Sequence, residues 1–220
     1  SSGPYTVKIS TTSNFDEPVE FIAVSGADVY LNDDEGNYEE LVEGTRGHYQ
    51  AYTFQGTPER TYTLRVVYES KEYTASSKLE SPLELDSLRF YENGCCSGLI
   101  CYFTDTPDVI DYCAIKVFVN GYEHYSQLYQ GRFTDGEVIA LDREHTGIHR
   151  GDRVRVYLYT FNKATYEYFS NLHVDTDEDD FDTDLPDIIP SGRSNPKTNL
   201  SNGALGHFGA MAVRTYYRVR

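Results

Sequence analysis

Short runs of alternating apolar and polar residues, separated by turn residues, recur along most of this 220-residue chain. The clearest run is TYTLRVVY, residues 61–68, which is rich in β-branched and aromatic side chains. Such runs at a spacing of roughly 8–12 residues are typical of antiparallel β-sandwiches. The pair Asn120-Gly121 separates two further runs and is a strong signal for a two-residue hairpin turn. The sequence therefore predicts an all-β fold.

The expected strands are short and are bounded by glycine, proline, asparagine or aspartate. They cover residues 5–9, 27–31, 38–42, 48–54, 61–68, 72–75, 85–91, 98–104, 112–120, 122–129, 136–141, 153–161 and 209–219.

One segment has the period of a helix. Thr165, Tyr168, Phe169 and Leu172 fall at i, i+3, i+4 and i+7, and Asn162 is a suitable N-cap. We expect one short helix near residues 163–172, although two or three strands are an alternative. The fold prediction is two immunoglobulin-like antiparallel β-sandwich domains, or one extended double sandwich, with this helix.

A domain boundary is expected at Ser81-Pro82-Leu83, because proline disfavours strand continuation and the pattern then restarts. The first expected domain covers residues 1–81. The second covers residues 82–220 and includes the helix, an acidic loop at 175–187 and a closing strand at 209–219.

The charge balance is strongly acidic, with 19 basic and 35 acidic residues and a formal net charge of −16. Such a surface repels the phosphates of nucleic acids and anionic lipid head groups, so no nucleic-acid partner is expected. No stretch of 18 consecutive apolar residues is present, and the sequence predicts no transmembrane helix.

The acidic run at 175–184 invites a calcium interpretation. Asp175, Asp177 and Asp179 match the first three ligand positions of an EF-hand loop. The match then fails, because Asp180 stands where glycine is required and Pro186 stands where glutamate is required. A solvated loop is the favoured interpretation, with a weak calcium site as the alternative. No other metal or cofactor site is predicted.

The four cysteines do not have the spacing of a zinc site. Cys101 and Cys113 lie at core-facing positions of neighbouring expected strands. If those strands form a hairpin, the two thiols lie nearly opposite each other and form either a disulfide or a pair of buried thiols. Cys95 and Cys96 lie in a glycine-flanked turn. No histidine stands in an identifiable relation to a cysteine, and no hydrolase motif is present, so we predict no catalytic residues and no enzyme.

Residues 195–213, NPKTNLSNGALGHFGAMAV, combine turn signals with small apolar residues. Asparagine side chains can bond nearby backbone, and glycines permit positive φ or close backbone approach. An ordered structural segment that delivers the last strand into its sheet is the favoured interpretation, and a ligand pocket is the alternative. The residues that define this motif are Asn195, Pro196, Asn199, Asn202, Gly203, Gly206, Phe208 and Gly209.

This motif resembles the C-terminal signature of a Bacteroidetes outer-membrane lipoprotein family, domain of unknown function 4249. Further matching pieces follow the same order along nearly the whole chain. They include Gly26-Ala27-Asp28-Val29, GTPERTYTL at 56–64, Tyr73-Thr74-Ala75-Ser76-Ser77, Leu85-Asp86-Ser87-Leu88, Val119-Asn120-Gly121 and Gly151-Asp152.

The resemblance implies an exported protein with a signal peptide and a lipid-modified N-terminal cysteine, anchored at the cell-surface or periplasmic face of the outer membrane. The chain starts at Ser1, so the resemblance implies that the signal, the anchor and the first strand of the first domain lie upstream of it. Family members often accompany TonB-dependent transporters, and no catalytic residues are assigned to the family. The expected function is a non-catalytic accessory or binding module beside such a transporter, with a glycan or peptide as a further possible ligand. A surface adhesin or spacer is the alternative, and a glycan or peptide hydrolase is less favoured.

Overall fold

The computed structural model describes residues 5–11, 22–93, 96–104, 107, 109–131, 138–143, 147–172 and 197–220. The described elements are β-strands in antiparallel sheets and one short helix, which confirms the predicted all-β class. The chain divides into two compact units, Ser1–Leu79 with Pro196–Ala210, and Glu80–Asn195 with Met211–Arg220. No helix within the described residues is both long enough and apolar enough to cross a membrane.

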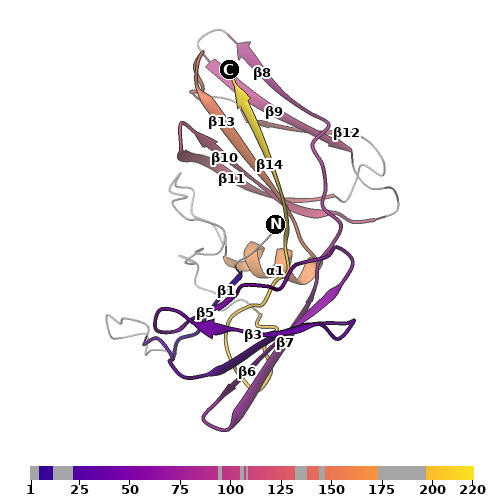
Figure 1. Ribbon diagram of the computed structural model, residues 1–220. Coiled ribbons are helices and arrows are strands. Elements are labelled where there is room, and N and C mark those ends of the chain that lie inside the picture. Colours follow the sequence, from indigo (N-terminus) through magenta and orange to yellow (C-terminus); the bar gives the residue numbers. More distant parts are fainter. Residues whose placement is uncertain are drawn as a thin grey trace. The chain divides into compact units, whose positions relative to one another are not determined.

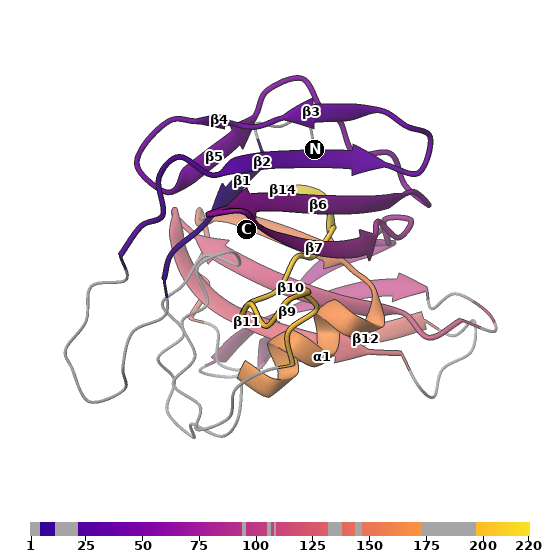
Figure 2. The ribbon, with the colours of Figure 1, turned by 90° about the horizontal axis from the view of Figure 1, so that it is seen from below.

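The first unit contains two antiparallel sheets, with strand orders β1-β5-β4 and β3-β2-β6-β7 (Figure 2). Burial alternates along the strands, so that Val29, Leu64 and Val66 point into the core. The strands are β1 (Tyr5–Lys8), β2 (Asp28–Asp33), β3 (Tyr38–Glu40), β4 (Val42–Glu43), β5 (His48–Ala51), β6 (Thr61–Tyr68) and β7 (Lys71–Lys78).

A buried tyrosine of β5, Tyr49, holds the loop before β2 in place. The Tyr49 ring is 1% exposed, and its hydroxyl donates to the Val24 carbonyl oxygen at 2.9 Å. The same hydroxyl accepts a hydrogen bond from the Ala27 amide at 3.0 Å. Both bonds lie in the interior, where an unpaired polar group would cost free energy, so the loop before β2 is held in a defined position.

The second unit is a sandwich of sheets β11-β10-β13-β14 and β12-β9-β8 (Figure 1). Leu99 and Phe103 of β9 pack in one core with Ile115 of β10 and Val156 of β13, so the core lies between the sheets. The strands are β8 (Ser87–Asn93), β9 (Cys96–Thr104), β10 (Tyr112–Val119), β11 (Tyr122–Gln130), β12 (Val138–Arg143), β13 (Arg153–Thr160) and β14 (Ala212–Val219).

The predicted helix is present as α1, Lys163–Leu172. Asn162 caps it, because its side-chain oxygen accepts from the Thr165 amide at 2.9 Å. Phe169 packs on Phe161 with ring centroids 5.8 Å apart, in a second apolar cluster that also contains Tyr112. The helical period read from the sequence is therefore confirmed, and it buries the expected face against β10.

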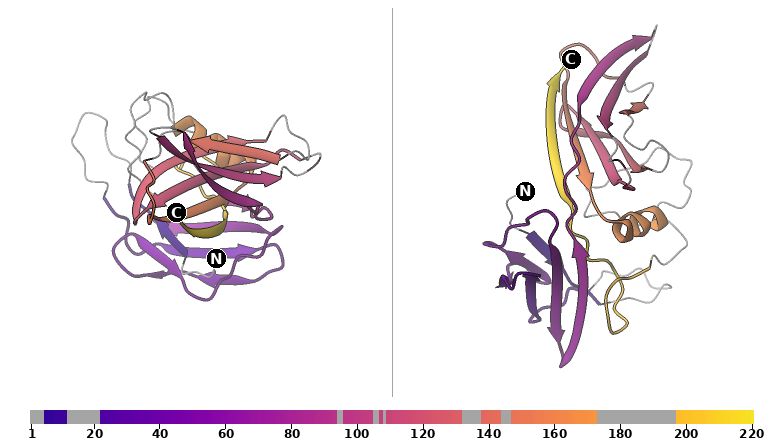
Figure 3. Two further views of the ribbon diagram at one scale, coloured as in Figure 1. Left: turned by 90° about the horizontal axis from the view of Figure 1, so that it is seen from above. Right: turned by 90° about the vertical axis from the view of Figure 1, so that its right-hand side faces the viewer.

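The division into units differs from the expected domains in one segment. Residues 196–210 were assigned to the second domain, whereas they group with the first unit. Only the closing strand β14 returns to the second unit, where it pairs with β13 in regular antiparallel register (Figure 3). The physical reason is a set of hydrogen bonds between residues 199–210 and β7, which is described below.

Candidate binding surface

The outer face of the sheet β11-β10-β13-β14 carries a row of aromatic and arginine side chains. Along β13, Val154, Val156 and Leu158 are buried in the sandwich core. The alternate residues, Arg155 and Tyr157 among them, point to the opposite face. This face therefore carries large side chains, of which Tyr159 packs against the apolar cluster under α1 and Arg155 is exposed.

Arg155 is the centre of this row. Its guanidinium carbon lies 5.0 Å from the ring centroid of Tyr217 on β14, a cation–π distance. Its Nη1 donates to the Tyr157 hydroxyl at 3.1 Å. The sheet register explains the arrangement, because Arg155 is paired with Tyr217 on one side and with Phe118 of β10 on the other.

The aromatic rings of the row also contact each other. Phe118 and Tyr157 meet edge to face at 5.5 Å, and Tyr157 stacks on Tyr159 at 6.2 Å. Such contacts fix the rings before any ligand arrives, which lowers the entropy cost of binding. We call this set the Arg155 strip, and it consists of Phe118, Arg155, Tyr157, Tyr159 and Tyr217.

The strip is open to solvent at its β14 side. Tyr217 is 61% exposed and Val219 is 68% exposed, although both are large apolar side chains. Arg155 is exposed as well, and its hydrogen bond to Tyr157 raises the pKa of the guanidinium above its already high usual value. The strip therefore offers a permanent positive charge between two tyrosine rings.

The sequence predicted the strands at 153–161 and 209–219, which carry Arg155, Tyr157 and Tyr217, but not that these residues form one surface. Tyr217 joins the strip through a strand pairing between distant segments, which no local pattern reveals. The available signal was the alternation in RVRVYLYT, residues 153–160, where both arginines and both tyrosines fall on one face.

Two acidic side chains of the first unit, Glu39 and Glu43, stabilise loops by accepting hydrogen bonds from backbone amides. Three successive amides, those of residues 52–54, donate to the Glu39 carboxylate. Burial alone would raise the pKa of Glu39, but these hydrogen bonds outweigh it and hold the pKa below its usual value. The amides of Gly47 and Gly26 donate to Glu43 and likewise lower its pKa. Both carboxylates are occupied in holding loops in place.

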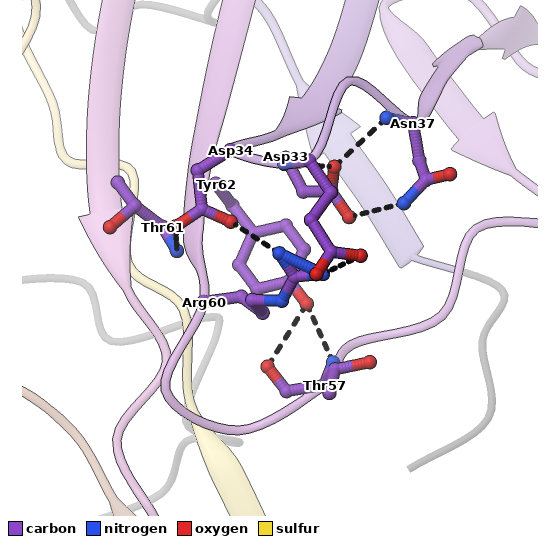
Figure 4. Close-up of polar contacts among 8 residues, drawn as sticks. Asp33, Asp34, Asn37, Thr57, Arg60, Thr61 and Tyr62 are labelled. Carbon is purple, nitrogen blue, oxygen red and sulfur yellow. Dashed lines mark hydrogen bonds and ion pairs between the residues drawn. The ribbon is translucent and has the colours of Figure 1, made fainter.

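The acidic turn after β2 is a third structural network (Figure 4). Asp33 accepts from the backbone amides of Glu35 and Asn37 and from the Asn37 side chain, at 2.8–3.0 Å. Arg60 forms ion pairs with Asp34, at 3.1 Å, and with Glu35. The acidic residues of this turn therefore have hydrogen-bond or ion-pair partners within the unit.

The glycine-rich C-terminal motif lies against β7, the edge strand of its sheet. The Ser201 amide donates to the Thr74 carbonyl, and the Thr74 amide donates to Ser201 Oγ, both at 2.8 Å. Further along, the Ala210 amide donates to Ser77 Oγ at 2.9 Å. The two bonds at Thr74 occupy backbone groups that an edge strand would otherwise present to solvent.

The motif is also braced internally. The Asn199 side chain donates to the Phe208 carbonyl at 2.8 Å and accepts from the Phe208 amide at 2.9 Å. Asn202 and Gly203 follow with φ of 57° and 75°, a conformation that asparagine and glycine tolerate best. Gly206 has φ of 115°, and Gly209 is half-buried. Asn195 and Pro196 lie outside the described residues.

The disulfide considered for Cys101 and Cys113 is not formed. Both cysteines are reduced and fully buried in the sandwich core. β9 pairs with β8 and β12, whereas β10 pairs with β11 and β13, so the two strands do not form the assumed hairpin. Burial raises the pKa of Cys101 to about 12, which keeps its thiol protonated.

The calcium candidates Asp175, Asp177 and Asp179 lie outside the described residues, and this site stays a prediction. Within the described ranges, no group of three histidine, cysteine, aspartate or glutamate side chains is placed to hold a metal ion.

Comparison with curated proteins finds no match to this chain. A family model does match, and it covers residues 1–217, almost the whole sequence. Its description is Domain of unknown function (DUF4249). The chain therefore belongs to this family, as its C-terminal motif indicated.

Proposed function

We propose that this protein is a non-catalytic binding module that works by contact with another protein. The observation that carries the proposal is the Arg155 strip, where an exposed arginine lies between Tyr157 and Tyr217. Tyrosine and arginine are enriched among the residues that dominate protein–protein binding energy. An exposed sheet face with preorganised rings suits binding to a protein surface.

The absence of an enzymatic role is part of the same proposal. In the first unit, Glu39 and Glu43 are held by backbone amides, so neither is free to exchange a proton with a substrate. In the second unit, the Cys101 thiol is buried, with a pKa of about 12, which argues against a role as nucleophile.

We further propose that the protein is an exported lipoprotein held at the outer membrane, where its partner is a TonB-dependent transporter. This part rests on the resemblance of the C-terminal motif and its accompanying segments to the lipoprotein family. A surface adhesin or spacer is the alternative outcome.

The test is affinity purification from native outer membranes. The full-length protein, with a tag on a flexible C-terminal linker, is extracted in mild detergent and its companions are identified by mass spectrometry. Recovery of a TonB-dependent transporter in near-equal amount is the expected result. Recovery of no membrane protein, in repeats with and without calcium, would contradict the proposal and leave adhesion as the function to examine.

A further inference from the structure

Strand β14 forms an edge of its sheet, with β13 as its strand neighbour in the described part of the chain. The Arg220 amide donates to the Asp152 carbonyl, next to the paired positions Val219 and Arg153. Because successive amides of a strand point to opposite sides, the even-numbered amides of β14 face β13. The amides that point away from β13 are those of Val213, Thr215, Tyr217 and Val219.

This edge is basic in a protein whose net charge is −16. The two strands β13 and β14, together with the final residue, contain no aspartate or glutamate. Their five arginines are Arg153, Arg155, Arg214, Arg218 and Arg220.

Part of this positive charge is not neutralised by the fold. Arg214 pairs with Glu84 at 2.9 Å and Arg220 pairs with Glu92 at 2.7 Å. Among the described residues, Arg153 and Arg155 have no carboxylate within ion-pair distance. Both are exposed on the outer face of the sheet, so their charge is available to a ligand.

A strand added at the edge of β14 would come within reach of the Arg155 side chain. A strand added to β14 would lie roughly 10 Å, two strand spacings, from the backbone of Arg155. Extended arginine and glutamate side chains can close that distance together. Every second residue of the added strand would face the side of Tyr217 and Val219, which is also the side of Arg155.

We propose that the β14 edge receives an extended acidic segment of a partner protein, added as a further strand. Main-chain hydrogen bonds to the outward amides give affinity, and acidic side chains at alternate positions reach Arg153 and Arg155. The inference deepens the proposed function, on which it rests, by assigning the surface and the chemistry of the partner. Charge complementarity selects the acidic segment, since a basic one would be repelled by Arg153 and Arg155 on this face.

The first experiment uses the whole chain and a synthetic probe, the capped nonapeptide TETETETET. Amide chemical shifts and hydrogen exchange are followed by NMR during titration to about 1 mM peptide, a range that detects weak binding. We expect new protection at the amides of Thr215, Tyr217 and Val219. The inward amides of Arg214 and Tyr216 are expected to stay as they were, because they already bond to β13.

Three controls separate the parts of the proposal. The peptide TKTKTKTKT has the same strand propensity and the opposite charge, so it should not bind. Thr215→Pro removes one outward amide at a position where an edge strand tolerates proline. It should abolish peptide-induced protection at the Tyr217 and Val219 amides while the fold is retained. Arg155→Gln should weaken binding by about tenfold, because it removes a charge-assisted contact.

Arg65→Gln is the matched control for Arg155. Arg65 also lies over a tyrosine ring, Tyr30, at 5.2 Å, but its guanidinium is held by Glu72 at 2.8 Å. It belongs to the first unit, so this substitution should leave peptide binding unchanged.

The proposal is overturned if no shift appears at the highest peptide concentration, if the basic peptide binds equally well, or if Arg155→Gln binds like the wild type. Protection of the outward amides without peptide, lost on dilution, would identify a second copy of this chain as the occupant and would also overturn it. Failure of the peptide test with a transporter still recovered from membranes refutes this inference alone. Failure to recover any transporter while the peptide binds refutes the proposed partner alone.

Discussion

The Lys116 ammonium lies 3.2 Å from a carboxylate oxygen of Glu123, across the β10–β11 pair. The two side chains are 1% and 11% exposed, so this ion pair is almost fully withdrawn from water. Lys116 is also the strand partner of Tyr157, which places the pair next to the Arg155 strip. Its loss should disturb the sheet that carries the candidate surface.

We expect Lys116→Met to destabilise the second unit by about 3–5 kcal/mol, because it leaves a buried carboxylate without its cation. The double variant Lys116→Met/Glu123→Gln should recover most of this loss. Thermal unfolding followed by circular dichroism gives both values. Equal stability of the single variant and the wild type would show that the pair is solvated.

The C-terminal motif should stabilise the first unit through Asn199. Asn199→Ala removes both hydrogen bonds to the Phe208 backbone and should cost about 1–3 kcal/mol, the range for leaving partly buried polar groups unpaired. Asn199→Asp keeps the acceptor and loses the donor, so an intermediate loss is expected. Urea unfolding measures the series, and an unchanged midpoint for the alanine variant would contradict the structural role.

Ser201 should protect one amide of the edge strand β7. In Ser201→Ala the Thr74 amide loses its acceptor at 2.8 Å. We expect faster hydrogen exchange at the Thr74 amide, with little change at the Ala75 amide, which points to the other side of the strand, towards β6. Equal acceleration along all of β7 would instead indicate that the whole segment detaches.

His207 should make the protein less stable in mild acid. Burial lowers the pKa of His207 to about 4, whereas the unfolded chain retains the usual value near 6.5. The unfolded state then binds the proton more readily. The folded state therefore keeps its full stability above pH 6.5, where His207 is neutral in both states, and loses stability as the pH falls from 6.5 towards 4.

This difference in pKa predicts that the contribution of His207 lowers the free energy of unfolding by about 1–2 kcal/mol between pH 7.5 and pH 5. The His207→Gln variant, which does not titrate, should lose less stability than the wild type over the same interval. Denaturant unfolding at both pH values measures the difference. Parallel losses in the two proteins would show that His207 is hydrated in the folded state.

Cys101 should resist alkylation in the folded protein. Its pKa of about 12 leaves very little thiolate at pH 8.5, and burial excludes the reagent. Peptide mapping after treatment with iodoacetamide should find Cys101 unmodified in the native protein and modified in denaturant. Rapid modification of the native protein would mean that the core opens.

Local patterns in the sequence predict the strands and the helix well. The Asn120-Gly121 turn has φ of 53° and 96°, as a two-residue hairpin turn requires, and Asn162 caps α1 as expected. These features depend on interactions between residues close together in the chain, so a pattern of a few residues is enough to predict them.

The candidate site depends on contacts between segments far apart in the sequence, which local sequence patterns cannot predict. Ser201 and Thr74 are 127 residues apart, so the sequence did not show that the C-terminal motif belongs to the first unit. The same limit applies to Arg155 and Tyr217, which meet through the β13–β14 pairing. The hairpin assumed for Cys101 and Cys113 was wrong, because the consecutive strands β9 and β10 enter different sheets, whereas the alternative of two buried thiols is confirmed.

The most direct test of the account is photo-crosslinking in living cells. A photoreactive phenylalanine replaces Tyr217 on the Arg155 strip and, in a control strain, replaces Tyr38, which is 73% exposed in the first unit. The account predicts a covalent adduct between the Tyr217 position and a TonB-dependent transporter, and none from the Tyr38 position. Adducts from Tyr38 alone, or equal adducts from both positions, would contradict the claim that this protein binds its partner through the Arg155 strip.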